Sequence, residues 1–178
     1  MKKRILFPLV VLVGCACILL TLTLSLNGVA RKNAQKTHLE VLHTLLPESE
    51  TFVLEEYTGE DSNIVSVHKG ETGVIVETLV YGYADNIRMM IAVEPDGKVV
   101  GIMVLELHET LGLGYRALRD HKFLSQYLGS STTMEVGDTI DAITGATVTS
   151  KAITKSINSA IAYVTGTDID SGATSWGE

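Results

Sequence analysis

Cysteine is nearly absent from this chain of 178 residues, which contains only Cys15 and Cys17. No disulfide can therefore form within the part beyond residue 17, and cysteine usage indicates no redox compartment. Basic residues are also scarce: beyond residue 32 there are 9 Lys and Arg against 21 Asp and Glu, a net charge of −12. This balance argues against nucleic acid as a partner and against a polybasic contact with anionic lipid, because both need cationic side chains.

Charged residues are missing from the segment between Ile5 and Leu26. At ~1.5 Å rise per residue, these residues span roughly 33 Å as a helix, which matches a bilayer core of about 30 Å. Basic residues flank the segment at positions 2–4 and 31–32. The pattern predicts a retained membrane anchor over residues 1–32, with the span at about 5–26. A span without ionisable residues gives no ion pathway, since such residues mark ion routes.

Two alternatives concern this anchor. The run from Leu12 to Cys15 looks like a lipoprotein cleavage site, but the apolar residues that continue from Ala16 to Leu26 argue against lipidation. The flanking charges give no clear orientation by the positive-inside rule. A short basic N-terminus before an apolar run resembles a signal anchor, so we expect a single-pass cell-membrane protein with an extracytoplasmic soluble domain.

Beyond the anchor, residues 33–60 are predicted to be a connecting helix and linker. Leucines at helical spacing predict the helix over residues 35–46, and Pro47 ends it. Strand patterns begin near Ile64 and continue over residues 73–83, 86–93 and 98–107. The turn residues Pro95, Asp96 and Gly97 separate the last two, which predicts a hairpin within a meander of three or four strands.

The remaining pattern adds helices to this sheet. A short helix is predicted over residues 115–127, a final strand over 136–140 and a helix over about 148–164. The last helix carries one apolar stripe, formed by Ile153, Ile157, Ala160, Ile161 and Val164. The sequence lacks a repeated βαβ pattern, so a Rossmann fold is not expected. The fold class predicted for residues 61–166 is α+β, an antiparallel sheet packed by helices, and residues 167–178 are predicted to be a flexible tail.

The most informative segment is Asp141 to Ser150, in which small residues lead into the last helix. A helix start attracts anions because its N–H groups lack partners and the positive end of the dipole faces the ligand. Gly145 permits close backbone approach, and Ala146 adds little bulk. The neighbouring hydroxyls are candidate caps, phosphate ligands or attachment points; they belong to Thr144, Thr147, Thr149 and Ser150. From composition alone, such residues are more often an ordinary helix cap.

This segment resembles the flavinylation motif of FMN-binding domains, which reads Asp, two residues, Ser or Thr, Gly, Ala, Thr, one residue, Ser or Thr. Such domains occur in the Rnf and Na⁺-translocating NADH:quinone oxidoreductase complexes. In that family the second Thr of the motif carries FMN through a phosphoester bond, and here that residue is Thr147. The resemblance also implies that Thr144, Gly145, Ala146 and Val148 surround the tether.

A second segment, His108 to Gly114, is similar to the Glu-Thr-Pro-Gly-Leu-Gly loop that borders the flavin in the same family. This chain has Leu111 where the family usually has Pro, but both glycines are present. The resemblance implies that four of these residues line the flavin: Glu109, Thr110, Leu113 and Gly114. With the anchor added, the chain resembles the G subunits of Rnf electron-transport complexes.

The resemblance implies a function. A flavin transferase that depends on FAD and Mg²⁺ would attach FMN to Thr147 and release AMP. The protein would then be an electron-transfer subunit rather than a stand-alone enzyme, with no catalytic residue and no metal site of its own. Its partners would be the lipid bilayer and the other subunits of an ion-translocating membrane complex, coupled to Na⁺ or H⁺.

Several alternatives stay open at this stage. The same helix start could hold FMN, or another phosphate-bearing ligand, reversibly in a sensor module, or the chain could be a structural subunit without a cofactor. A second motif-like run, Ser171 to Ser175, lies in the tail, but no helical pattern follows it. Thr147 is therefore favoured over Thr174. A hydrolase is not supported, because no nucleophile elbow or second ligand cluster accompanies His108 and Glu109.

Overall fold

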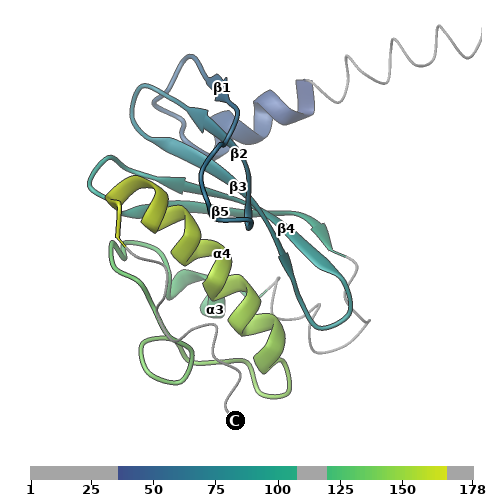
Figure 1. Ribbon diagram of the computed structural model, residues 1–178. Helices are drawn as coiled ribbons and strands as arrows, with labels where there is room; N and C mark the ends of the chain where they lie inside the picture. Colours follow the sequence, from purple (N-terminus) through teal and green to yellow (C-terminus); the bar gives the residue numbers. More distant parts are fainter. Residues whose placement is uncertain (1–35, 108–119, 168–178) are drawn as a thin grey trace, which may run out of the picture. The chain divides into compact units, whose positions relative to one another are not determined.

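The computed structural model describes residues 36–107 and 120–167. The chain divides into two compact units, Met1–Val41 and Leu42–Glu178, and residues 36–45 are helical where the sequence predicts a helix over 35–46. Figure 1 shows the elements of the second unit. They are β1 (Val53–Glu55), β2 (Ile64–Lys69), β3 (Val74–Tyr81), β4 (Asn86–Val93), β5 (Val99–Leu107), α3 (His121–Ser125) and α4 (Thr147–Thr165).

The strands form one antiparallel sheet in the order β1-β2-β3-β4-β5. The predicted α+β class is confirmed, but the sheet has five strands within the described residues rather than three or four. The strand missed by the prediction is β1, a three-residue edge strand in which Val53 and Leu54 are exposed. The hairpin between β4 and β5 turns as predicted, with Gly97 at φ 88°.

One face of the sheet is covered by α4, which lies across it in Figure 1. Alternate residues of each strand point to this face, so Val76 on β3 and Ile91 on β4 pack with the helix in the core. On the helix, Ile153, Ile157 and Ile161 are fully buried. The predicted apolar stripe is therefore confirmed, except that Val164 is only half-buried.

The opposite face of the sheet packs against the first residues of the second unit. Leu42, Leu45 and Leu46 are buried there, and a Cβ at Gly101 would lie 2.9 Å from Leu45 Cδ2. This face also carries a charged pair, in which Arg88 Nε lies 2.8 Å from a carboxylate oxygen of Glu77. Both faces of the central strands are therefore buried, one under α4 and the other under the three leucines. The sheet provides the surface against which α4 packs.

Two sequence predictions for the segment before α4 need correction. Residues 136–140 do not form a strand but a turn, closed by an isolated bridge between Val136 and Ile140. Gly137 has φ 94° and its N–H donates to Ile140 O at 2.8 Å, which folds this run back on itself. Of the helix predicted over 115–127, only residues 120–127 are described, and the helix found there is shorter than predicted. It spans His121–Ser125, with Asp120 as its N-cap.

Within residues 36–107 and 120–167, no helix has the length and apolar character needed to cross a bilayer. The predicted anchor over residues 1–32 lies outside the described residues, as does nearly all of the predicted tail over 167–178.

Candidate functional site

A four-residue turn delivers the chain into α4. Ala146 N donates to Ile143 O at 2.9 Å, which closes the turn. Gly145 stands at its third position with φ 82°, a conformation that favours glycine because other residues meet a steric penalty there. The helix begins at Thr147, one residue before the predicted start. The proposed attachment residue is therefore the first residue of the longest helix in the described part of the chain.

The start of α4 has no side-chain cap among the described residues. Ala146 occupies the N-cap position and makes no side-chain hydrogen bond to the first turn. Of the alternatives left open for these hydroxyls, an ordinary helix cap is therefore not what the structure shows. The first turn also contains no acidic residue. The N–H groups of Thr147, Val148 and Thr149 can therefore serve an external acceptor, and the dipole adds a partial positive charge at this end. Such a helix start suits a phosphate group.

The motif residues differ in exposure. Thr144, Gly145 and Thr147 are exposed, so the Thr147 hydroxyl can be reached from solvent. Val148 is half-buried, whereas Ala146 is buried beneath the turn. Ala146 belongs to the core cluster, directly before the attachment residue in sequence.

The second predicted group, Glu109, Thr110, Leu113 and Gly114, lies outside the described residues. The strand before it shows where this segment begins. Leu107, the last residue of β5, pairs with Ile87 near the start of β4. Tyr163 and Val164, near the end of α4, lie at the opposite end of the sheet, around Val74. β5 therefore ends at the end of the sheet toward which the start of α4 points (Figure 1).

Two side chains hold the attachment turn in a way that the sequence did not indicate. Ser150 Oγ donates to Ala146 O at 2.9 Å and accepts from Ile143 N at 3.3 Å. Gln126, at the C-cap of α3, contacts both backbone groups of Asp141: Asp141 N donates to Oε1 at 2.8 Å, and Nε2 donates to Asp141 O at 3.2 Å. Neither contact could be predicted from the sequence, because each joins a side chain to backbone groups. Every residue has such groups, so they produce no recognisable sequence pattern.

A buried hydrogen-bond chain continues from Ser150 into the core. Thr154 Oγ1 donates to Ser150 O at 2.9 Å and lies 2.8 Å from the Tyr127 hydroxyl. Since the Thr154 proton is used toward Ser150, Tyr127 donates to Thr154. Burial raises the pKa of Tyr127 far above its usual range, because the buried site disfavours the charged phenolate. The phenol is therefore a permanent donor at physiological pH.

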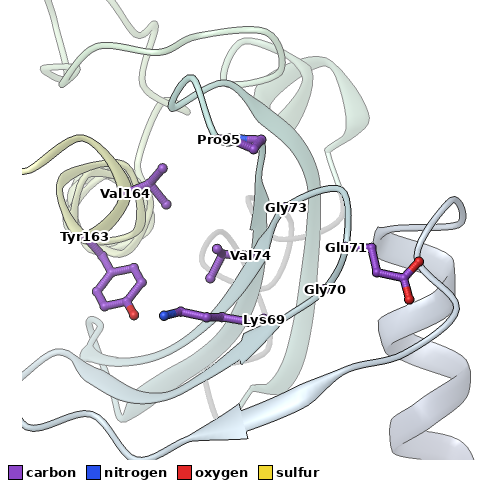
Figure 2. A pocket seen from close by; sticks show the side chains of 8 residues that line it. All are labelled: Lys69, Gly70, Glu71, Gly73, Val74, Pro95, Tyr163 and Val164. Carbon is purple, nitrogen blue, oxygen red and sulfur yellow. The ribbon is translucent and has the colours of Figure 1, made fainter.

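A cavity of about 380 Å³ lies at the other end of α4, away from Thr147. Figure 2 shows that Lys69 and Tyr163 point toward one another across it, whereas Glu71 points away. Lys69 Nζ is 2.9 Å from Glu55 Oε2, and the hydrogen bond and charge of Glu55 raise the pKa of the Lys69 ammonium. No predicted site residue lines this cavity, and its one ammonium group already has a carboxylate partner.

Comparison with known families finds a match over part of this chain. Residues 82–162 match the model of the FMN-binding domain family. The match covers β4, β5 and α3 and ends near the end of α4, so it includes both predicted motifs. The predicted resemblance to FMN-binding domains is confirmed.

Individual relatives narrow the resemblance to one kind of protein. The chain is 38% identical to the G subunit of the proton-translocating ferredoxin:NAD⁺ oxidoreductase complex of Clostridium ljungdahlii, over 47% of this chain and 49% of the relative. It is 33% identical to the Na⁺-translocating counterpart of Acetobacterium woodii, over 61% and 54%. The G subunit of an ion-translocating oxidoreductase complex of Methanosarcina acetivorans is 28% identical over 90% and 93%. The chain spans about half the length of the first two relatives. The predicted similarity to G subunits is confirmed.

Proposed function

We propose that this chain is a membrane-anchored flavoprotein that carries FMN on Thr147 through a phosphoester bond. It relays electrons between subunits of an Rnf-type ion-translocating oxidoreductase complex. The observation that supports this most is the position of Thr147. It is an exposed hydroxyl at the first residue of an uncapped helix, inside the stretch that matches FMN-binding domains.

The chemistry of attachment fits the residues at this helix start. The Thr147 oxygen attacks the FMN phosphorus of FAD, so an O–P bond forms there as the pyrophosphate bond breaks. AMP leaves, and the Thr147 proton passes to a base on the transferase, which also supplies Mg²⁺. The product is a phosphodiester with one negative charge. The N–H groups of Thr147, Val148 and Thr149 would stabilise that charge, and no carboxylate in the first turn opposes it.

A covalent tether suits a domain on the extracytoplasmic side. We place the soluble domain there, anchored by residues 1–32, where no pool of free FMN replaces a lost cofactor. Once bound, the isoalloxazine ring supplies the redox chemistry, and the protein sets its orientation and exposure. Glu109, Thr110, Leu113 and Gly114 would line the ring, a placement supported by β5, which ends at the same end of the sheet toward which the start of α4 points.

The partners follow from the same comparison. The relatives are named as G subunits of ion-translocating oxidoreductase complexes, so we assign this chain to a complex of that kind, in contact with other membrane subunits. The relatives' names specify protons in one case and Na⁺ in another, and the proposal assigns no ion. Asp141, exposed at the start of the motif, is the residue through which the transferase would recognise the chain.

The test is the intact mass of the full chain, purified in detergent after co-expression with a flavin transferase. The proposal predicts a mass gain equal to FMN less one water, and flavin fluorescence that stays with the protein on a denaturing gel. Flavin that co-purifies but is lost on denaturation would instead identify the reversible binding module. A chain without flavin, from cells in which the transferase labels a control acceptor, would overturn the proposal.

A further inference from the structure

We infer that Ser150 and Gln126, both outside the attachment motif, are positioning residues that set the rate of flavin transfer to Thr147. The inference rests on the proposed function. It concerns how the turn over residues 141–146 acquires one fixed shape before the transferase engages it.

Ser150 fixes the second half of the turn. It is fully buried, one helical turn beyond Ala146, and its hydroxyl contacts two backbone groups that bracket the turn, Ile143 N and Ala146 O. Ile143 O is held separately by Ala146 N. Both backbone polar groups of Ile143 are therefore satisfied, and the turn is closed onto the first turn of the helix that begins at Thr147.

Gln126 fixes the first half of the turn from a different helix. Its side-chain amide makes two hydrogen bonds to the backbone of Asp141, one as acceptor and one as donor. An amide is the side-chain group that meets both needs at once, because it presents a carbonyl and an NH₂ side by side. The contact uses the backbone of Asp141 and leaves its carboxylate exposed to solvent.

A buried hydrogen-bond chain connects the Gln126 contact with the Ser150 contact. Tyr127 follows Gln126 directly and donates to Thr154, which in turn donates to Ser150 O. Asn158 is a second side-chain amide that holds backbone, accepting from Met134 N at 2.9 Å and donating to Met134 O at 2.8 Å. The connection from α3 to α4 is thus held at residues 134, 141, 143 and 146 by side chains that the motif does not include.

Fixed geometry matters for the transfer step because an attacking oxygen must lie close to the phosphorus and in line with the bond that breaks. A misplacement of about 1 Å can lower such a rate on the order of 100-fold. Loss of one turn contact should shift Thr147 by less than that. We therefore expect transfer to be slowed about tenfold, with its maximal rate affected more than the apparent affinity for the chain.

The experiment follows the time course of flavin transfer to the full chain, using purified transferase, FAD and Mg²⁺ over a range of chain concentrations. The variants are Ser150→Ala, Gln126→Leu and Gln126→Glu, the last of which keeps the acceptor for Asp141 N but loses the donor to Asp141 O. Ser156→Ala is the matched control, because Ser156 is a fully buried serine of the same helix whose hydroxyl has no hydrogen-bond partner among the described residues. All rates are measured at a temperature at which circular dichroism shows each variant folded.

The inference predicts that Ser150→Ala and Gln126→Leu are labelled slowly but to completion, that Gln126→Glu is intermediate, and that Ser156→Ala matches the wild type. Wild-type rates in Ser150→Ala and Gln126→Leu would overturn it. A lower final extent at an unchanged rate would also overturn it, because that result marks a misfolded fraction rather than a misplaced hydroxyl. If Ser150→Ala does not fold, half-buried Gln126 still decides the question. A wild-type chain that takes no flavin would instead refute the proposed function.

Discussion

Replacing Thr147 with Val should abolish covalent flavin in the full chain after incubation with transferase, FAD and Mg²⁺. Valine keeps the shape of threonine but lacks the oxygen that forms the phosphoester. Thr147 is exposed and lies one residue beyond the N-cap position, so the free energy of unfolding should change by no more than about 0.5 kcal/mol. Intact mass measures the first effect and urea denaturation the second. Thr147→Ser should retain the flavin because it retains the hydroxyl.

The matched control for this variant is Thr174→Val, because Ser171 to Thr174 repeats the Ser-Gly-Ala-Thr run of the motif. Thr174 lies outside the described residues. We expect full labelling of Thr174→Val, since the motif before and after Thr147 is complete with Thr149 at its last position, whereas Trp176 stands at the corresponding position after Thr174. Labelling that survives Thr147→Val and disappears in Thr174→Val would contradict the assignment.

Replacing Ile157 with Ala should lower the free energy of unfolding by about 3 kcal/mol. Ile157 is fully buried in the core between α4 and the sheet, and truncation removes three carbon atoms from a close-packed interior that cannot fully collapse around the gap. Urea denaturation followed by circular dichroism measures the loss. Leu128→Ala is the control, because Leu128 is 49% exposed and should cost less than about 1 kcal/mol.

The same variant tests whether the attachment site depends on the packed helix. Flavin transfer to Ile157→Ala should match the wild type at temperatures where the variant is folded, and should fall with its unfolding transition. Undiminished transfer to the unfolded chain would show that the transferase reads the linear motif alone. That result would contradict the role assigned to the turn and to the start of α4.

Much of the fold could be read from local sequence patterns. The stripe of Ile153, Ile157 and Ile161 predicts a buried helix face because its spacing follows the helical period, and all three are buried. The turn at Gly97 was predictable because Pro, Asp and Gly each favour turn geometry for a local reason. The attachment motif could also be recognised from the sequence, because its residues are contiguous.

Other features depend on tertiary contacts and were not predictable. The run from Val136 to Ile140 looks like a strand, but its glycine adopts positive φ and the segment closes on itself. The burial of Ser150 and Asn158 on α4 depends on backbone groups brought from the connection between α3 and α4. A hydroxyl at a helix start predicts a cap, whereas here Ser150 reaches back to close the turn before the helix.

The most direct test of the central claim is peptide mapping of the flavin-loaded chain. Trypsin cleaves after Lys and Arg, so Thr147 falls in the peptide of residues 123–151 and Thr174 in the peptide of residues 156–178. The account predicts that the mass gain of FMN less one water is carried by the first peptide, and that fragmentation places it on Thr147. The same gain on the second peptide, or on Thr144, Thr149 or Ser150, would contradict it.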